Sequence, residues 1–379
     1  MKAKGLYVHI PFCLSKCAYC DFCSFTEYDS CIVDSYVDAL TKEIRGYKRD
    51  GISVDTIFIG GGTPSILSIE NFEKIIKEIK TTFNTSQISE FTVEMNPRSV
   101  DEKKLRALYS LGVNRLSIGL QSVHENELKI LGRNQSYEDF IAVYNSARAV
   151  GFTNISVDVM YGIPSQTMDS LSKTLDRVLA LSPEHISLYS LIIEEGTPIY
   201  ENRQSLSIPD DDTVGNMYDL VNMTLMDAGY IHYEISNYSR VGLESRHNMK
   251  YWMLDDYIGV GISAHSFNNG ARYFNPGDRC DIDSLKGYIN DPGQRMTEGV
   301  LGSDDLLIEY IMLSLRTNRG IILSEFHKRF NKEFTDGREG EIAELLRGGL
   351  AVLDKDRFYL SERGMLVSNS IICELLKNS

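Results

Sequence analysis

The sequence of 379 residues contains only nine prolines, a single tryptophan and no long uninterrupted apolar run. A helix that crosses a bilayer needs about 20 consecutive apolar residues, which excludes a membrane-spanning protein. The apolar stretch 5–12 contains His9 and Pro11 and lacks a small-residue cleavage site, so it does not match a secretory signal. With 42% hydrophobic and 24% charged residues, the composition predicts a globular, cytoplasmic protein with at most peripheral membrane contact.

Basic side chains are also in the minority, with 39 Lys and Arg against 53 Asp and Glu and a net charge of −14. The summed field of such a surface repels phosphate backbones and anionic lipid. A nucleic-acid-binding protein of this charge would need a local basic patch. We therefore predict that nucleic acid is not a partner.

Cysteine is sparse outside the first tenth of the chain, because five of the seven cysteines lie close together near its start. These five are Cys13, Cys17, Cys20, Cys23 and Cys31. Only Cys280 and Cys373 lie far away. This distribution is not typical of a disulfide scaffold, and in a reducing compartment clustered thiols indicate metal ligands or redox groups.

Short apolar segments alternate with segments of helical periodicity along the first 200 residues. We expect strands at 5–11, 56–60, 90–95, 115–120, 154–160 and 185–193, and helices at 33–48, 69–82, 101–111, 137–150 and 168–181. The alternation predicts parallel strands joined by right-handed crossovers. Polar or glycine residues end nearly every strand, which favours a barrel, because (β/α) barrels build active sites at the carboxyl ends of their strands. The predicted fold class is α/β, with a (β/α)6 partial TIM-type barrel over residues 1–205.

Two further regions follow the predicted barrel. Residues 206–295 predict an α+β extension that packs on the barrel. Its elements are a helix at 211–228, a strand at 230–235 and a hairpin with arms 261–267 and 271–275.

Residues 296–379 predict a C-terminal winged-helix-like domain. Its elements are helices at 304–317, 323–330 and 338–347, a hairpin with arms 351–354 and 358–360, and a last helix that ends at 376. Winged helices often bind DNA, but this region has 11 basic and 14 acidic side chains. We therefore expect an interaction or lid domain.

Cys13, Cys17 and Cys20 have the spacing C-x3-C-x2-C in a loop directly after the first predicted strand. Three thiolates can hold three irons of a [4Fe-4S] cube and leave the fourth iron open to a substrate. Structural zinc sites and ferredoxin-type clusters take four ligands instead. Cys23 has the spacing that would complete a zinc site with Cys20, and zinc is therefore the alternative. We predict Cys13, Cys17 and Cys20 as cluster ligands.

This loop resembles that of the radical S-adenosylmethionine (SAM) superfamily, in which the open iron binds SAM. The likeness is more specific than the superfamily, because further segments are similar to the group related to oxygen-independent coproporphyrinogen III oxidase. These segments are Tyr7–Cys13, Cys20–Ser24, Gly60–Pro64, Glu94–Pro97, Leu116–Ser122 and Asp158–Pro164. Two more, Arg246–Trp252 and Gly259–Ser266, resemble the heme-chaperone branch of that group. The resemblance covers nearly the whole chain.

The resemblance implies a set of SAM contacts. The implied positions are Tyr7, Gly61, Gly62, Thr63, Glu94, Gln121, Arg133 and Asp158. Glycines let the backbone approach a ligand closely, and the planar guanidinium of Arg133 can form a fork with the SAM carboxylate. The oxygens of Glu94, Gln121 and Asp158 would accept hydrogen bonds from an ammonium or from ribose hydroxyls. Without the resemblance, Arg133 would equally suit a solvated surface position, and the carboxylates would suit helix caps.

His247 decides between the functions that we consider. With Tyr251 and Trp252 it could present an axial imidazole and a flat aromatic surface to a heme. The alternative is a polar motif that packs the extension against the barrel. His9 suits a structural hydrogen bond or a role in tuning the cluster, and His265 suits the mouth of the site or the bracing of a turn.

We therefore expect a heme chaperone that holds a [4Fe-4S] cluster and SAM, binds heme and passes it to an acceptor protein, with an electron donor as a further partner. The alternative is an oxygen-independent coproporphyrinogen III dehydrogenase, which decarboxylates two propionates by radical chemistry. Two features favour the chaperone: the cluster cysteines begin as early as Cys13, and Phe22 occupies the position at which the resembled oxidases have a fourth cysteine. A DNA-binding regulator is disfavoured by charge, and we assign no catalytic residue.

Overall fold

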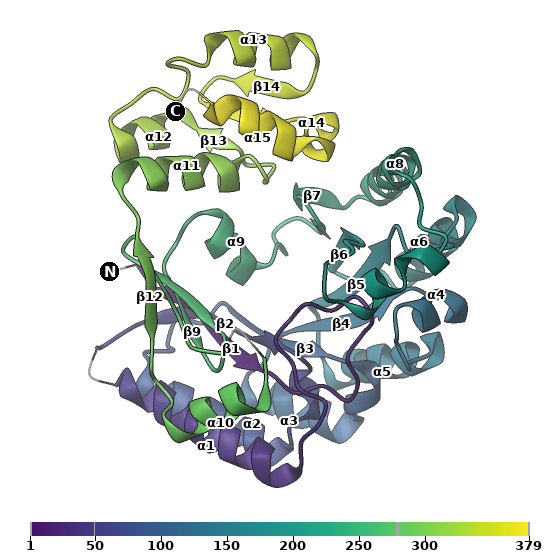
Figure 1. Cartoon of the computed structure of the whole chain (residues 1–379), viewed down its shortest axis with the longest axis vertical. Coiled ribbons are helices and arrows are strands. Elements are labelled where there is room, and N and C mark those ends of the chain that lie inside the picture. Colours follow the sequence, from purple (N-terminus) through teal and green to yellow (C-terminus); the bar gives the residue numbers. More distant parts are fainter. Residues whose placement is uncertain (1, 49, 278–279, 378–379) are drawn as a thin grey trace.

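The computed structural model describes residues 2–48, 50–277 and 280–377 (Figure 1). Its largest element among these residues is one sheet of twelve strands, in the order β12-β11-β10-β9-β1-β2-β3-β4-β5-β6-β8-β7. Six parallel strands in chain order form its centre, and they are β1 (Lys4–Ile10), β2 (Val54–Gly61), β3 (Glu90–Met95), β4 (Arg115–Gln121), β5 (Ile155–Tyr161) and β6 (His185–Ser190). The two edges, β12 (Met296–Val300) and β7 (Ile231–Glu234), leave the sheet open. This is the predicted partial barrel.

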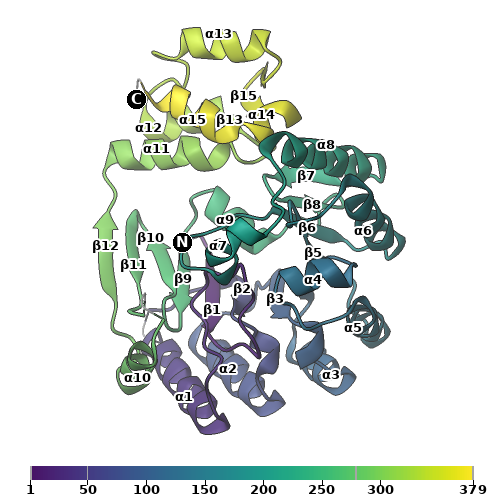
Figure 2. The ribbon, with the colours of Figure 1, turned by 45° about the vertical axis from the view of Figure 1, so that its right-hand side comes forward.

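The predicted crossover helices connect these strands, and Figure 2 shows them together on one side of the sheet. They are α1 (Ser30–Gly46), α2 (Ile69–Thr82), α3 (Glu102–Leu111), α5 (Tyr137–Val150) and α6 (Met168–Ala180). Each begins after a polar side chain that accepts a hydrogen bond from the amide three residues later, which satisfies a free helix N–H group. These caps are Asp29, Ser68, Asp101, Ser136 and Thr167. A short helix before α5, α4 (Glu125–Ile130), was not expected.

Side chains along the central strands alternate between two environments. On β4 and β5, Ile118 and Val157 are fully buried in the core shared with the helices. Ser117 and Asp158 occupy the alternate positions and line a cavity on the other face. Because successive strand residues face opposite sides, the apolar positions hold the helices while the polar positions remain for a site.

The extension, together with β12 at the start of the C-terminal region, adds strands to both sides of the parallel centre. On one side lie β9 (Tyr257–Val260), β10 (His265–Asn268), β11 (Ala271–Phe274) and β12, and on the other lie β8 (Asn237–Ser239) and β7. The helices of the extension are α8 (Asp211–Asp227), α9 (Arg246–Trp252) and α10 (Ile282–Asn290), and the short helix α7 (Pro198–Glu201) precedes it. Asn269 and Gly270 join β10 to β11 with positive φ angles of 51° and 79°, as the predicted tight turn requires.

The first arm of that hairpin was predicted too long. β10 begins at His265 rather than 261, and β9 ends just before Gly261. Gly261 has a φ of +101°, and a Cβ there would lie 2.7 Å from the carbonyl oxygen of His9. The chain therefore turns at this glycine, against the end of β1.

The C-terminal region forms its own hydrophobic core. Its elements are α11 (Ser303–Ser314), β13 (Ile321–Ile322), α12 (Leu323–Phe330), α13 (Glu339–Arg347), β14 (Ala351–Asp354), β15 (Arg357–Leu360), α14 (Glu362–Leu366) and α15 (Ser368–Leu376). The expected three helices and hairpin are present, with β13 added to the hairpin. The last helix differs from the expectation, because Val367 separates α14 from α15.

This region is attached to the large sheet through β12, which pairs with β11. The domain boundaries at residues 205 and 295 stay predictions. A further contact joins His232 Nδ1 on β7 to Glu362 Oε2 on α14 at 2.6 Å. Over the described ranges, we find no helix with the length and apolarity to cross a membrane.

Candidate functional site

A cavity of about 740 Å³ opens at the carboxyl ends of the parallel strands. Its wall combines the loop after β1 with residues at the ends of the other central strands. The predicted residues on this wall are Cys13, Cys17, Cys20, Gly61, Gly62, Thr63, Glu94, Gln121, Arg133 and Asp158. The structure therefore brings together every predicted site residue except Tyr7 and His247.

The loop between β1 and α1 (residues 11–29), which we call the cysteine loop, lies along one side of this cavity. All three cysteines on the cavity wall carry free thiols. Cys13 is buried, whereas Cys17 and Cys20 are partly buried. The Thr63 hydroxyl donates to Cys13 Sγ at 3.4 Å. Burial raises the pKa of the Cys13 and Cys20 thiols, against hydrogen bonds that lower them. A metal would have to supply the positive charge that stabilises these groups as thiolates.

Gly62, directly after β2, lies close to the cysteine loop. Its amide donates to the carbonyl of Ile10 at 2.8 Å, and the amide of Thr63 donates to that of Phe12 at 2.8 Å. A Cβ on Gly62 would lie 2.8 Å from the Phe12 carbonyl oxygen and 3.0 Å from Cys13 Sγ. The glycine is therefore required by the close approach of the two backbones.

Two partly buried carboxyl groups face the cavity, Glu94 from β3 and Asp158 from β5. Glu94 Oε2 accepts from the Gly61 amide at 3.0 Å, and Asp158 Oδ1 accepts from the Ser117 hydroxyl at 3.0 Å. Burial, with the nearby charge of Asp158, raises the pKa of Glu94 to about 8. Burial also raises the pKa of Asp158. A cationic ligand would offset both effects, so this part of the wall suits a positively charged group.

Unpaired polar atoms on the same wall also fit a polar ligand. Among the described residues, Gln121 Oε1 and Arg133 Nε are buried without a hydrogen-bond partner. Arg133 Nη2 donates to the hydroxyl of Tyr19 at 3.1 Å, which fixes the guanidinium beside the cysteine loop. A buried polar atom without a partner costs about 1–3 kcal/mol, which a ligand with a carboxylate and hydroxyl groups would recover. The free hydrogen-bond donors and acceptors of the wall therefore match the polar groups of SAM.

Tyr7 lies on β1 but not on the cavity wall. Its hydroxyl lies 3.0 Å from Nδ1 of His9, and Nε2 of His9 lies 3.1 Å from the carbonyl oxygen of Cys23. Burial lowers the pKa of His9 to about 4, so the ring is neutral. His9 thus has the structural hydrogen bonds that were one of its two expected roles, and the contact of Tyr7 with SAM stays a prediction.

His247, on α9, is fully buried and away from the cavity. Its Nδ1 lies 3.0 Å from the Thr56 hydroxyl and its Nε2 lies 2.8 Å from the Tyr251 hydroxyl. The ring stacks on Phe58 at 5.4 Å between centroids. Because both nitrogens are engaged within the chain, this arrangement argues against the predicted heme contact and matches the packing alternative. Heme ligation at His247 would require α9 to move.

Sequence reasoning left out several residues of the wall. The hydroxyl of Tyr19 holds Arg133 in place. The position of Tyr19 between Cys17 and Cys20 in the sequence could have identified it as a residue of the site. Three large apolar side chains at the cavity are strongly exposed: Leu14 (60%), Phe22 (68%) and Ile192 (67%). The expected role of His265 at the mouth is not observed, because this residue lies on β10 near Glu298 and outside the cavity wall.

The zinc alternative requires four ligands on one ion. Within the described ranges, no group of three or more His, Cys, Asp or Glu side chains is arranged to hold a single metal ion. Cys23, the proposed fourth ligand, does not line the cavity. The loop therefore suits a cluster, in which each thiol holds a different iron, better than a zinc ion.

Known proteins are similar to this chain in sequence and in structure. Residues 7–178 match the radical SAM superfamily, and residues 301–367 match the HemN C-terminal domain. The heme chaperone HemW of Lactococcus lactis is 33% identical over 99% of this chain and 98% of its own length. That of Bacillus subtilis is 35% identical over 97% of this chain and 98% of its own length.

A solved structure supports the same fold. It is that of coproporphyrinogen III oxidase (HemN) from Escherichia coli, described as a radical SAM enzyme. It is 24% identical to this chain, with a TM-score of 0.86 over 99% of this chain and 90% of the other.

Proposed function

This chain belongs to the family of HemW heme chaperones within the radical SAM superfamily, and from that premise we propose that it binds heme and transfers it to an acceptor protein. The observation that carries the proposal is the single cavity that joins three free thiols, a polar wall suited to SAM and an exposed apolar rim. Large apolar side chains that gather at a cavity and stay exposed to water mark a binding surface.

The resident cofactors are a [4Fe-4S] cluster and SAM. Cys13, Cys17 and Cys20 would hold the cluster, with the Thr63 hydroxyl as a hydrogen-bond donor to the first of these sulfurs. When bound, cluster and SAM together supply one-electron chemistry that the side chains of a protein cannot perform. An electron donor is therefore a partner of the loaded protein.

The chain's own residues would orient SAM in the cavity. Arg133 would form a fork with the SAM carboxylate, since Tyr19 already holds the guanidinium against the cysteine loop. Glu94 and Asp158 would accept from the ammonium or the ribose hydroxyls, and Gln121 Oε1 offers a further free acceptor. Gly61, Gly62 and Thr63 would let the ligand approach the end of β2.

Heme would cover the apolar rim that Leu14, Phe22 and Ile192 expose at the cavity. The flat macrocycle would remove these side chains from water, which contributes about 25 cal/mol per Å² of buried apolar area. Lys16 and Arg98 also lie on the cavity wall and are exposed, so they can pair with the two propionates. This placement requires no movement of α9.

The decisive experiment is anaerobic reconstitution of the full chain, followed by two parallel assays. We expect a Soret band on titration with heme and no decarboxylation of coproporphyrinogen. Conversion of coproporphyrinogen to protoporphyrinogen with consumption of SAM would replace the chaperone assignment with the dehydrogenase. The curated relatives do not favour that alternative.

We place the protein in the cytoplasm, where Cys13, Cys17 and Cys20 stay reduced. The acidic balance of the chain and of its C-terminal region supports a protein acceptor rather than nucleic acid. Incubation of the heme-loaded protein with candidate acceptors, followed by the Soret band of each partner after separation, tests the transfer.

A further inference from the structure

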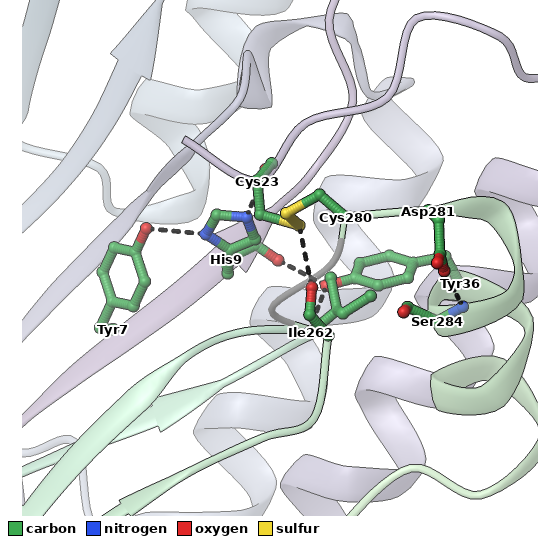
Figure 3. The surroundings of a disulfide bond; sticks show 9 residues. Tyr7, His9, Cys23, Tyr36, Ile262, Cys280, Asp281 and Ser284 are labelled. Atoms are coloured by element: carbon green, nitrogen blue, oxygen red, sulfur yellow. Dashed lines mark hydrogen bonds between the residues drawn. A yellow bond between two sulfur atoms is a disulfide. The ribbon is translucent and has the colours of Figure 1, made fainter. Parts of the chain in front are cut away.

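Cys23 belongs to the cysteine loop but lies on its opposite side. Its neighbours Phe22 and Ser24 line the cavity, whereas Cys23 does not. Its side chain is buried at 8% exposure, and its sulfur forms a disulfide with Cys280, 257 residues later in the chain (Figure 3). The pair therefore crosslinks the cysteine loop to the extension.

Cys280 lies between β11 and α10, and the described residue Gly277 before it packs closely against Ile262, which follows β9. The Cys280 amide donates to the Gly277 carbonyl at 2.9 Å, and a Cβ on Gly277 would lie 2.3 Å from Ile262 Cγ1. The sulfur of Cys23 also lies 3.7 Å from the Gly277 carbonyl oxygen. A reduced Cys23 thus has an acceptor for its S–H group, so the site accommodates the thiol as well as the disulfide.

The disulfide is linked to the first cluster ligand, Cys13, through the backbone of the cysteine loop. The carbonyl of Cys23 contacts His9 on β1, as Figure 3 shows. Two residues later, the Phe25 amide donates to the Pro11 carbonyl at 2.6 Å, and the Phe25 carbonyl accepts from the Cys13 amide at 2.9 Å. A displacement of Cys23 would therefore reach Cys13 along the backbone to Phe25 and through the one hydrogen bond between Phe25 and Cys13.

We infer that Cys23 and Cys280 form a reversible redox tether that keeps the cysteine loop in its cluster-binding shape. On oxidation the two thiols lose two electrons and two protons to hydrogen peroxide, which becomes two molecules of water, and one S–S bond forms. A dithiol protein of the thioredoxin class reverses the step by exchange and becomes a disulfide itself. Cys280 is the sulfur that reacts first in both directions, because it is partly exposed while Cys23 is buried. In the oxidation its thiolate attacks the peroxide with loss of one water, and the Cys23 thiol then attacks the oxidised Cys280 sulfur with loss of the second water. In the reduction the incoming thiolate attacks the Cys280 sulfur and releases the Cys23 thiol.

The tether is tested on the cluster-free full-length protein, so that its result does not depend on the proposed cofactors. Wild type, Cys280→Ser and Cys23→Ser are each compared in reduced and peroxide-treated form, with Cys373→Ser as the control because Cys373 is exposed and free. In oxidised wild type and in the control, we expect a crosslinked Cys23–Cys280 peptide by mass spectrometry. We also expect at least tenfold slower hydrogen exchange at 13–25 than in the reduced form.

Neither serine variant should show the crosslink or the protection. A crosslink between Cys23 and Cys20 in its place, or equal exchange at 13–25 in oxidised and reduced wild type, would overturn the inference. After reconstitution, a chelator should remove iron several-fold more slowly from oxidised wild type than from Cys280→Ser. If wild type takes up no cluster but shows crosslink and protection, the proposed function fails and the tether stands.

Discussion

The carboxylate of Glu94 accepts a hydrogen bond from the amide of Gly61 at 3.0 Å, which ties the end of β3 to the end of β2 at the wall of the cavity. The group is partly buried on the cavity wall, and its pKa is raised to about 8 by burial and by the charge of Asp158. Glu94 is therefore mostly protonated at pH 7 in the free protein. A cationic ligand would reverse that state.

We expect SAM binding at pH 7 to release about one proton, because the ligand's ammonium stabilises the Glu94 carboxylate. Calorimetric titration in two buffers of different ionisation enthalpy measures this number. In Glu94→Gln the release should vanish, whereas Glu43→Gln should keep it, since Glu43 also has a carboxyl with a raised pKa but lies outside the cavity. The same proton release in wild type and Glu94→Gln would remove Glu94 from the SAM site.

The contribution of Glu94 to the stability of the ligand-free protein should fall as the pH rises from about 4.5 to 8, and it is measured as the difference between wild type and Glu94→Gln. The Glu94 carboxyl holds its proton more tightly when folded than when unfolded, so the folded state loses this advantage as the group ionises. Urea unfolding at a series of pH values checks the direction. Glu94→Gln cannot ionise, so it carries only the pH dependence of the other groups.

The three cavity thiols should each be needed for iron. We expect Cys13→Ala, Cys17→Ala and Cys20→Ala to lose most of the cluster after anaerobic reconstitution, while Cys31→Ala and Cys373→Ala, at exposed positions, retain it. Cys23→Ala should also retain iron under reducing conditions, because its sulfur does not reach the cavity. Iron and sulfide analysis measures the content, and an intact cubane in Cys17→Ala would contradict the ligand set.

Arg133→Ala should weaken SAM binding by roughly ten- to a hundredfold, since a charge-assisted hydrogen bond contributes about 1.5–3 kcal/mol. Arg148→Ala serves as the control, because Arg148 pairs with Glu184 outside the cavity. Equilibrium binding of SAM to the reconstituted proteins provides the comparison. Equal affinities in the two variants would place the SAM carboxylate elsewhere.

His247→Ala should lower the free energy of unfolding by about 2–4 kcal/mol, because it removes a buried stacked ring and leaves the Thr56 and Tyr251 hydroxyls without a partner. His265→Ala, at an exposed ring, should change stability little. Urea unfolding compares the two. A changed Soret spectrum in heme-loaded His247→Ala would show that α9 opens to present the ring, which the arrangement observed here does not.

Local signals were sufficient for much of the fold. The predicted bounds of α2 and α5 agree with the structure at both ends, because Ser68 and Ser136 cap them through hydrogen bonds within three residues. The alternation of strands and helices likewise predicted the parallel centre. Such features depend on neighbours in the chain, and a sequence displays them directly.

The composition of the site could be predicted from the amino-acid sequence alone: the spacing of Cys13, Cys17 and Cys20, and the polar residues at strand ends that meet at one edge because parallel strands share a direction. Which groups face that edge became clear from the folded protein. In the folded protein, the Tyr7 hydroxyl contacts His9, the ring of His247 lies between Thr56 and Tyr251, and Cys23 is bonded to Cys280. These outcomes depend on packing between segments up to 257 residues apart, and no local pattern specifies which buried partner a side chain will find.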